Sequence, residues 1–165
     1  MADDTNRATL SISGLTIAQG TDPITQSIAP GEIVAIYGTA IGPSTLVRPQ
    51  LTTDGKSLTK LLGGTRVLFD DTPAAMIYTL DTQVSAVAPY DVSGKTTVNV
   101  TVEYNGVRSA AFPVTVAASA PAIFTLDQSG KNAGAILNQD YSVNGTSNPA
   151  ARGSVIQIFC TGAGV

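Results

Sequence analysis

The chain has 165 residues, of which 43% are hydrophobic and only 13% are charged, so it can bury a core although its charge content is about half that of an ordinary soluble domain. The net charge is −3 and the nine basic residues are scattered, which excludes the clustered Lys and Arg that nucleic acid or an anionic membrane surface would require. No run of about 18 apolar residues is present, so we expect no membrane insertion.

Short runs rich in Val, Ile, Thr, Tyr and Phe, separated by Gly, Pro, Asn and Asp, predict strands along almost the whole chain. After a flexible N-terminus at residues 1–8, the expected strands are 9–17, 32–37, 65–69, 75–79 and 83–88. The long connection over residues 38–64 is expected to contain a helical turn at 58–62. Residues 75–79 are expected to pair back on 65–69 as a hairpin, across the turn at Asp70 and Asp71.

The clearest pattern lies at residues 97–104, where every second side chain from Val98 to Tyr104 is apolar. This alternation is typical of a half-buried antiparallel strand. Asn105 and Gly106 then favour a type I′ hairpin turn, and Pro113 in the returning strand (110–116) suits an edge position. Seven short strands over roughly a hundred residues predict an all-β fold, an Ig-like antiparallel β-sandwich.

Two segments of the chain match without a gap, residues 29–42 and residues 151–164. Gly31 aligns with Gly153 and Gly42 with Gly164, a constant offset of 122 positions. Chance similarity between two strands is the alternative, but the matching turn glycine and trailing glycine favour a duplication. We therefore expect a complete sandwich over residues 9–126 and an incomplete second Ig-like unit over residues 127–165.

An incomplete unit of two strands cannot bury its apolar face. It would leave an open edge suited to pairing with a partner, formed by Val155, Ile156, Ile158, Phe159 and Cys160. Three arrangements are open. The chain continues beyond residue 165 in a longer protein, the tail folds back on the first sandwich, or the tail completes a sheet in another subunit. The last arrangement would make the protein a filament subunit.

The single cysteine, Cys160, excludes an intrachain disulfide. We expect it to be a small buried strand residue, with an intermolecular disulfide or a reactive thiol as the alternative.

Three stretches carry a resemblance to a known family: IAPGEIVAIYGTAIGP (28–43), LGGTRVLFDDTPAAMIYTLDTQVSAVAPYDVSGKTTVNVTVEYNGVRSAAFPVTVAASAPAIFTL (62–126) and GAILNQDYSVNGTSNPAARGSVIQIFCTGAG (134–164). They resemble the repeated C-terminal region of large secreted proteins from Solibacter and related acidobacteria. That region is similar to IPT/TIG domains, an Ig-like fold of cell-surface receptors and extracellular bacterial proteins. The resemblance implies a secreted or cell-surface sandwich without catalytic residues, in which the second segment continues into a full domain.

No catalytic, cofactor or metal site is indicated by the residues themselves. The chain has no histidine, which excludes Ser-His-Asp and Cys-His catalysis, and it has no phosphate-binding motif. The carboxylate pair Asp70 and Asp71 is expected to be a polar turn, with a weak calcium site as its rival. Tyr90 and Tyr141 fall in turns and are the candidates for a binding surface.

These features predict a protein that is not an enzyme and has no cofactor. We expect a non-catalytic extracellular structural or adhesive module, whose partners are other copies of itself or neighbouring extracellular domains. The alternative is a carbohydrate- or protein-binding module of a larger secreted protein.

Overall fold

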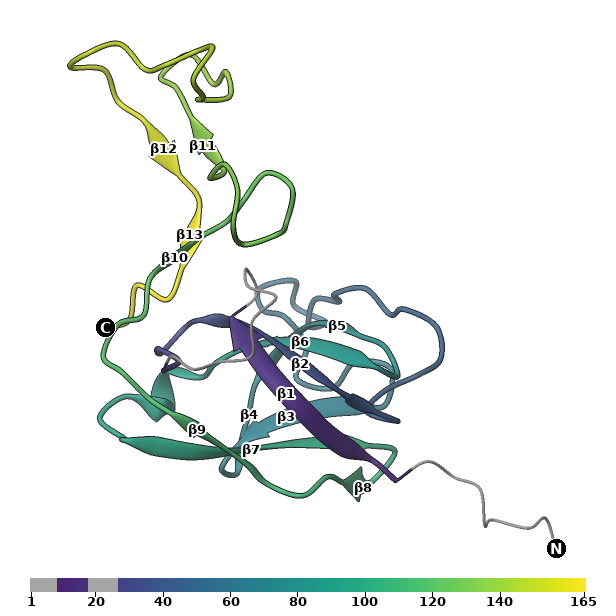
Figure 1. The fold of residues 1–165 in the computed structure, drawn as a ribbon. Helices are drawn as coiled ribbons and strands as arrows, with labels where there is room; N and C mark the ends of the chain where they lie inside the picture. Colours follow the sequence, from purple (N-terminus) through teal and green to yellow (C-terminus); the bar gives the residue numbers. More distant parts are fainter. Residues whose placement is uncertain (1–8, 18–26) are drawn as a thin grey trace, which may run out of the picture.

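The computed structural model describes residues 9–17 and 27–165, so the expected flexible N-terminus at 1–8 lies outside the described residues. The described chain is nearly all strands and turns, with one short 3-10 helix, η1 (Tyr90–Val92). None of its helices is long and apolar enough to cross a membrane. Figure 1 shows two packed sheets from which a narrow C-terminal arm projects.

The two sheets have antiparallel neighbours throughout. The first has the order β1 (Ser11–Ile17), β2 (Ile33–Thr39), β6 (Gln83–Val87) and β5 (Ala75–Thr79). The second joins β3 (Thr65–Phe69) to β7 (Thr97–Tyr104), with β4 (Thr72–Pro73) beside β3, and β8 (Val107–Arg108) and β9 (Phe112–Thr115) beside β7. The prediction of an all-β antiparallel sandwich is confirmed.

The core lies between the two sheets because successive side chains of a strand point to opposite faces. From the first sheet, Val34 and Ile36 point inward and are fully buried. From the second sheet, Phe69, Val100 and Val102 meet them and are also fully buried. The alternation seen in the sequence at residues 97–104 therefore marks the inner face of β7.

The hairpin between β7 and β8 forms as predicted. Asn105 and Gly106 have φ angles of 49° and 82°, and a type I′ turn requires positive φ at both central positions. Pro113 lies exposed in β9, which pairs with β7 on one side. An edge position tolerates the missing amide hydrogen of proline.

Two local predictions in the sandwich are wrong. The segment 75–79 does not pair with β3, because β4 takes that place and Ala74 still donates its backbone N–H to Val67; β5 then crosses to the first sheet and pairs with β6. The expected helical turn at residues 58–62 is also absent from the described chain. There Leu58 forms a β-bridge with Leu51. Thr59 donates its backbone N–H to Gln50 of the loop, and its C=O accepts from Met76 of β5.

The arm consists of four very short strands in two pairs. β10 (Ala122–Ile123) pairs with β13 (Cys160–Thr161), and β11 (Ile136–Leu137) pairs with β12 (Gln157–Ile158). Residue 126, the expected end of the first unit, lies within this arm. Because Ala117 still donates a backbone hydrogen bond to Ile28 in the sandwich, the arm begins just after it.

Candidate interaction site

The sequence repeat is also a repeat of strand pairing. In the sandwich, Thr39 of β2 lies opposite Ser11, the first residue of β1. In the arm, the equivalent Thr161 lies opposite Ala122, the first residue of β10. The same equivalence holds farther along the strand, where β11 takes the place of the second half of β1. The arm is therefore built like the β1–β2 pair of a sandwich.

Backbone conformation repeats at the same offset. Gly31 and Gly153, which precede the matching strands, have φ angles of 75° and 84°. Ala40 and Gly162, which follow them, have φ angles of 56° and 75°. Glycine adopts left-handed conformations readily, whereas alanine adopts them rarely, so the match of Ala40 with Gly162 is the more informative of the two. Their recurrence supports a duplication over a chance match of two strands.

Burial separates the two copies. Val34 and Ile36 of β2 are fully buried, whereas their equivalents Ile156 and Ile158 are 42% and 47% exposed. The second sheet covers β2 in the sandwich. No segment of the described chain covers the corresponding face of the arm. The apolar side chains that would point into a core, Ile156 and Ile158, therefore stay exposed.

The five predicted pairing residues all lie on one exposed segment, residues 155–160, which contains β12 and the first residue of β13. Val155 and Phe159 are 67% and 48% exposed, so the apolar surface includes both faces of the strand. Cys160 is exposed on β13, and the expectation of a buried cysteine is wrong. Its strand position was foreseen, but burial required a covering layer that the arm lacks.

One edge of this strand is open in the described part of the chain. Phe159 donates its backbone N–H to Ala135 (3.1 Å) and its C=O accepts from Phe124 (2.9 Å), so both groups point toward β10 and β11. The direction of the backbone N–H and C=O groups alternates from one strand residue to the next. The N–H and C=O groups of Ile158 and Cys160 therefore point to the opposite edge, away from β10 and β11. In the sandwich, that edge of β2 is filled by β6.

The open edge also lacks the usual protection. Natural edge strands carry charged side chains or proline, which discourage pairing with other chains. No charged residue and no proline occurs in residues 153–165. The edge can therefore accept another strand without burying a charge.

The base of the arm is held against the sandwich at a junction of small and polar groups. The backbone N–H of Ile33 donates to Thr161 Oγ1 at 2.8 Å. A Cβ atom added at Gly162 would lie 2.2 Å from the backbone oxygen of Ala120 and 2.8 Å from Glu32 Oε1. Only glycine fits this close approach.

Glu32 is a residue of this junction that sequence reasoning missed. Its side chain is fully buried, and Oε2 accepts a hydrogen bond from the Ala29 backbone N–H at 2.7 Å. Oε1 has no hydrogen-bond partner among the described residues. Burial raises the pKa of this carboxyl to about 7. A signal was present, since Glu32 is the one charged residue in an apolar stretch between Pro30 and Thr39.

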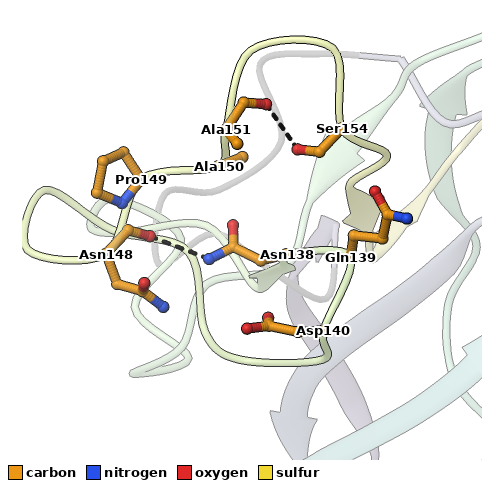
Figure 2. A pocket seen from close by; sticks show the side chains of 8 residues that line it. All are labelled: Asn138, Gln139, Asp140, Asn148, Pro149, Ala150, Ala151 and Ser154. Carbon is orange, nitrogen blue, oxygen red and sulfur yellow. Dashed lines mark hydrogen bonds between the residues drawn. The ribbon is translucent and has the colours of Figure 1, made fainter.

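The tip of the arm holds a shallow cavity of about 580 Å3, lined by both polar and apolar side chains (Figure 2). Figure 2 shows Asn138 donating to the backbone oxygen of Asn148, and Ser154 donating to that of Ala151. Because Asn138 Oδ1 also accepts from Asn144, this buried amide is structural. Gln139 and Asp140 lie exposed in the lining, where their amide and carboxylate groups could meet a polar ligand.

The two tyrosines proposed for binding lie on different parts of the molecule. Tyr141 follows Asp140 at the tip of the arm and is strongly exposed. Tyr90 lies in η1 of the sandwich, exposed, with its hydroxyl over Gly31. The tip therefore combines one exposed ring with polar side chains, and Tyr90 does not belong to it.

The carboxylates of the β3–β4 turn are held by structural partners. Asp70 accepts from the Asn99 backbone N–H at 2.9 Å and pairs with Lys95 at 2.6 Å, and these bonds lower its pKa. Asp71 is almost fully exposed, with its carboxylate 3.8 Å from the guanidinium of Arg108. Across the described ranges, no three His, Cys, Asp or Glu side chains gather as a metal-binding group.

No protein-family model matches the chain, and no curated protein matches it significantly.

Proposed function

We propose that the protein is a non-catalytic structural or adhesive module, secreted or at the cell surface, with an Ig-like sandwich similar to IPT/TIG domains. In this proposal its C-terminal arm joins it to a neighbouring chain. The observation that carries the proposal is the uncovered apolar segment 155–160, which contains β12 and the start of β13 and whose equivalent in the sandwich is buried on one face and paired on both edges.

Pairing with another strand would bury apolar side chains that are exposed in the described chain. Full burial of an aliphatic or aromatic side chain contributes about 1.5–3 kcal/mol, and Ile156, Ile158 and Phe159 are each near half exposure. A strand partner would also satisfy the backbone groups on the open edge. Together these gains would offset part of the entropy lost on association.

The extracellular assignment has separate support. The low charge and the richness in Thr, Ser, Asn and Gly agree with a secreted bacterial β-protein. The resemblance to the repeated region of secreted acidobacterial proteins points the same way. A head-to-tail contact between arm and neighbour would give filaments, and a symmetric contact would give closed assemblies.

Light scattering after size-exclusion chromatography, with electron microscopy, tests this proposal on the full chain. We expect an assembled species that becomes monomeric in Ile158→Asp, because the new charge would be buried at the contact. The matched control is Thr146→Asp, an exposed residue of the same arm outside the strand. A protein that is monomeric at every concentration would contradict the proposal.

A second candidate function is supported by the tip cavity. Its exposed Gln139 and Asp140, with the neighbouring Tyr141, offer hydrogen-bonding groups and a ring that suit a carbohydrate or a polar peptide. A glycan array with the wild type and Tyr141→Ala tests this, with Tyr90→Ala as the control. Binding that survives Tyr141→Ala, or no binding at all, would count against it.

A further inference from the structure

The exposed segment around β12 has an apolar pattern that is the same in both chain directions. From Val155 to Phe159, two apolar residues stand on either side of Gln157. A two-fold symmetric contact uses the same surface of both molecules and therefore requires a self-complementary surface. The segment 155–159 meets this requirement in both side-chain type and the absence of charge.

Hydrogen-bond directions restrict the possible registers. On the open edge, the available backbone groups belong to Ile156, Ile158 and Cys160, since those of Phe159 point toward β10 and β11. The equivalent edge of β2 works in the same way, where Gly38 donates to Thr82 beside β6. If the partner is an antiparallel second copy, residues from this set (Ile156, Ile158, Cys160) must therefore lie opposite residues from the same set in the partner.

A two-fold axis at Gln157 satisfies this condition. It places Ile156 opposite Ile158 as hydrogen-bonded pairs, and the two Gln157 residues opposite each other as a non-hydrogen-bonded pair. Val155 then lies opposite Phe159, so apolar side chains meet on both faces. Cys160 lies opposite Ser154, which keeps the two native thiols apart.

The faces also match across the axis. Residues directly opposite each other in a sheet share a face. Ile158 lies opposite Ile136, and Cys160 opposite Ile123, within each arm. Pairing through Ile156 and Ile158 would therefore join the isoleucines of both arms into one apolar face.

Another copy's β6 cannot fill this edge, although β6 fills the equivalent edge of β2. In the sandwich, β6 is already paired with β2 on one side and β5 on the other. The arm of a second copy has the same open edge and projects away from its sandwich (Figure 1). Two arms can meet without opening either sandwich.

Resting on the proposed function, we infer that the neighbouring chain is a second copy of this protein. The two arms pair antiparallel, edge to edge, with Gln157 on the two-fold axis. The arms then form one sheet that spans both molecules, and the assembly closes as a dimer.

A cysteine placed on the axis tests this register in the full chain. Gln157→Cys, in a Cys160→Ser background, puts two thiols at a non-hydrogen-bonded pair, where Cα atoms lie about 4.5 Å apart and a disulfide can form. We expect most of the protein to migrate as a disulfide-linked dimer after mild oxidation. Val155→Cys in the same background is the matched control, because its two thiols would lie on the order of 14 Å apart along the strand. It is expected to stay uncrosslinked.

Light scattering of the same unoxidised variants separates the two possible failures. An assembled species that does not crosslink through Gln157→Cys, or that crosslinks equally through Val155→Cys, overturns the two-fold register and leaves the proposed function in place. A monomer at all concentrations overturns both.

Discussion

The sandwich and the arm contain the same strand pattern in two different surroundings. Val34 and Ile36 are fully buried in the core of the sandwich, whereas Ile156 and Ile158 are each nearly half exposed. Each of these strands is paired on one edge, β2 with β1 and β12 with β11. Pairing on this edge therefore does not explain the difference in burial. The difference is a second sheet and a β6 strand, which shows that an alternating sequence specifies a strand but not its burial.

The sandwich and the arm meet at a junction, where we expect a single substitution to affect the stability of both regions. Thr161 and Gly162 belong to the arm, and Glu32 and Ile33 belong to the sandwich. Four measurements compare the regions and the contact between them.

The largest contrast is expected between two phenylalanines. Phe69→Ala should lower the free energy of unfolding by about 3–5 kcal/mol, because it leaves a cavity at a fully buried site. Phe159→Ala, in the exposed strand, should cost less than about 1 kcal/mol in the monomer. Urea denaturation followed by circular dichroism at low protein concentration measures both. Equal losses would mean that the arm has a core of its own.

Glu32 should make stability depend on pH. The carboxyl of Glu32 has a pKa of about 7 in the folded chain against its ordinary value of 4.5, so the folded state binds more protons between these values. The free energy of unfolding should fall by about 3 kcal/mol as pH rises from about 4.5 to above 7. Glu32→Gln stays neutral, and its contribution should not change over this window. Denaturation series at several pH values check this, and an identical decline in the variant would refute the role of Glu32.

Gly162→Ala should loosen the arm from the sandwich. The substitution adds a Cβ against the Ala120 backbone oxygen at a φ of 75°, and we expect a cost of about 2 kcal/mol with faster hydrogen exchange at the junction. Gly153→Ala is the matched control, since its φ is 84° but no atom lies within 4 Å of the added group. It should cost only about 1 kcal/mol for the backbone conformation. Equal exchange rates in the two variants would argue against a tight junction.

Thr161→Val should have the smallest effect of the four. It removes the hydroxyl that accepts from the partly buried Ile33 backbone N–H, and leaving this N–H without a partner should cost about 1 kcal/mol. Thr53→Val, at an exposed loop position, should stay within about 0.5 kcal/mol of the wild type. Thermal unfolding of both variants measures the difference. If Thr161→Val is as stable as the control, water replaces the hydroxyl.

Local features of the sequence were sufficient where the physics is local. The alternation from Val98 to Tyr104 and the turn at Asn105 and Gly106 predicted β7 and its hairpin, since both depend on neighbouring residues. The pairing of residues 75–79 was missed because the choice between two sheets depends on contacts far apart in the chain. The five pairing residues of the candidate site were predicted from the sequence and are exposed in the structure, whereas Glu32 entered the candidate site only through packing.

Strand periodicity, turn chemistry and the repeat at residues 29–42 and 151–164 are readable from the amino-acid sequence, because each arises from backbone preferences and side-chain alternation along the chain. Burial is different, because it needs a second layer that the strand itself does not encode. The same pattern lies in a core at Ile36 and on an open surface at Ile158. The folded arrangement alone shows which copy is covered, and the exposed copy is where the proposed partner surface lies.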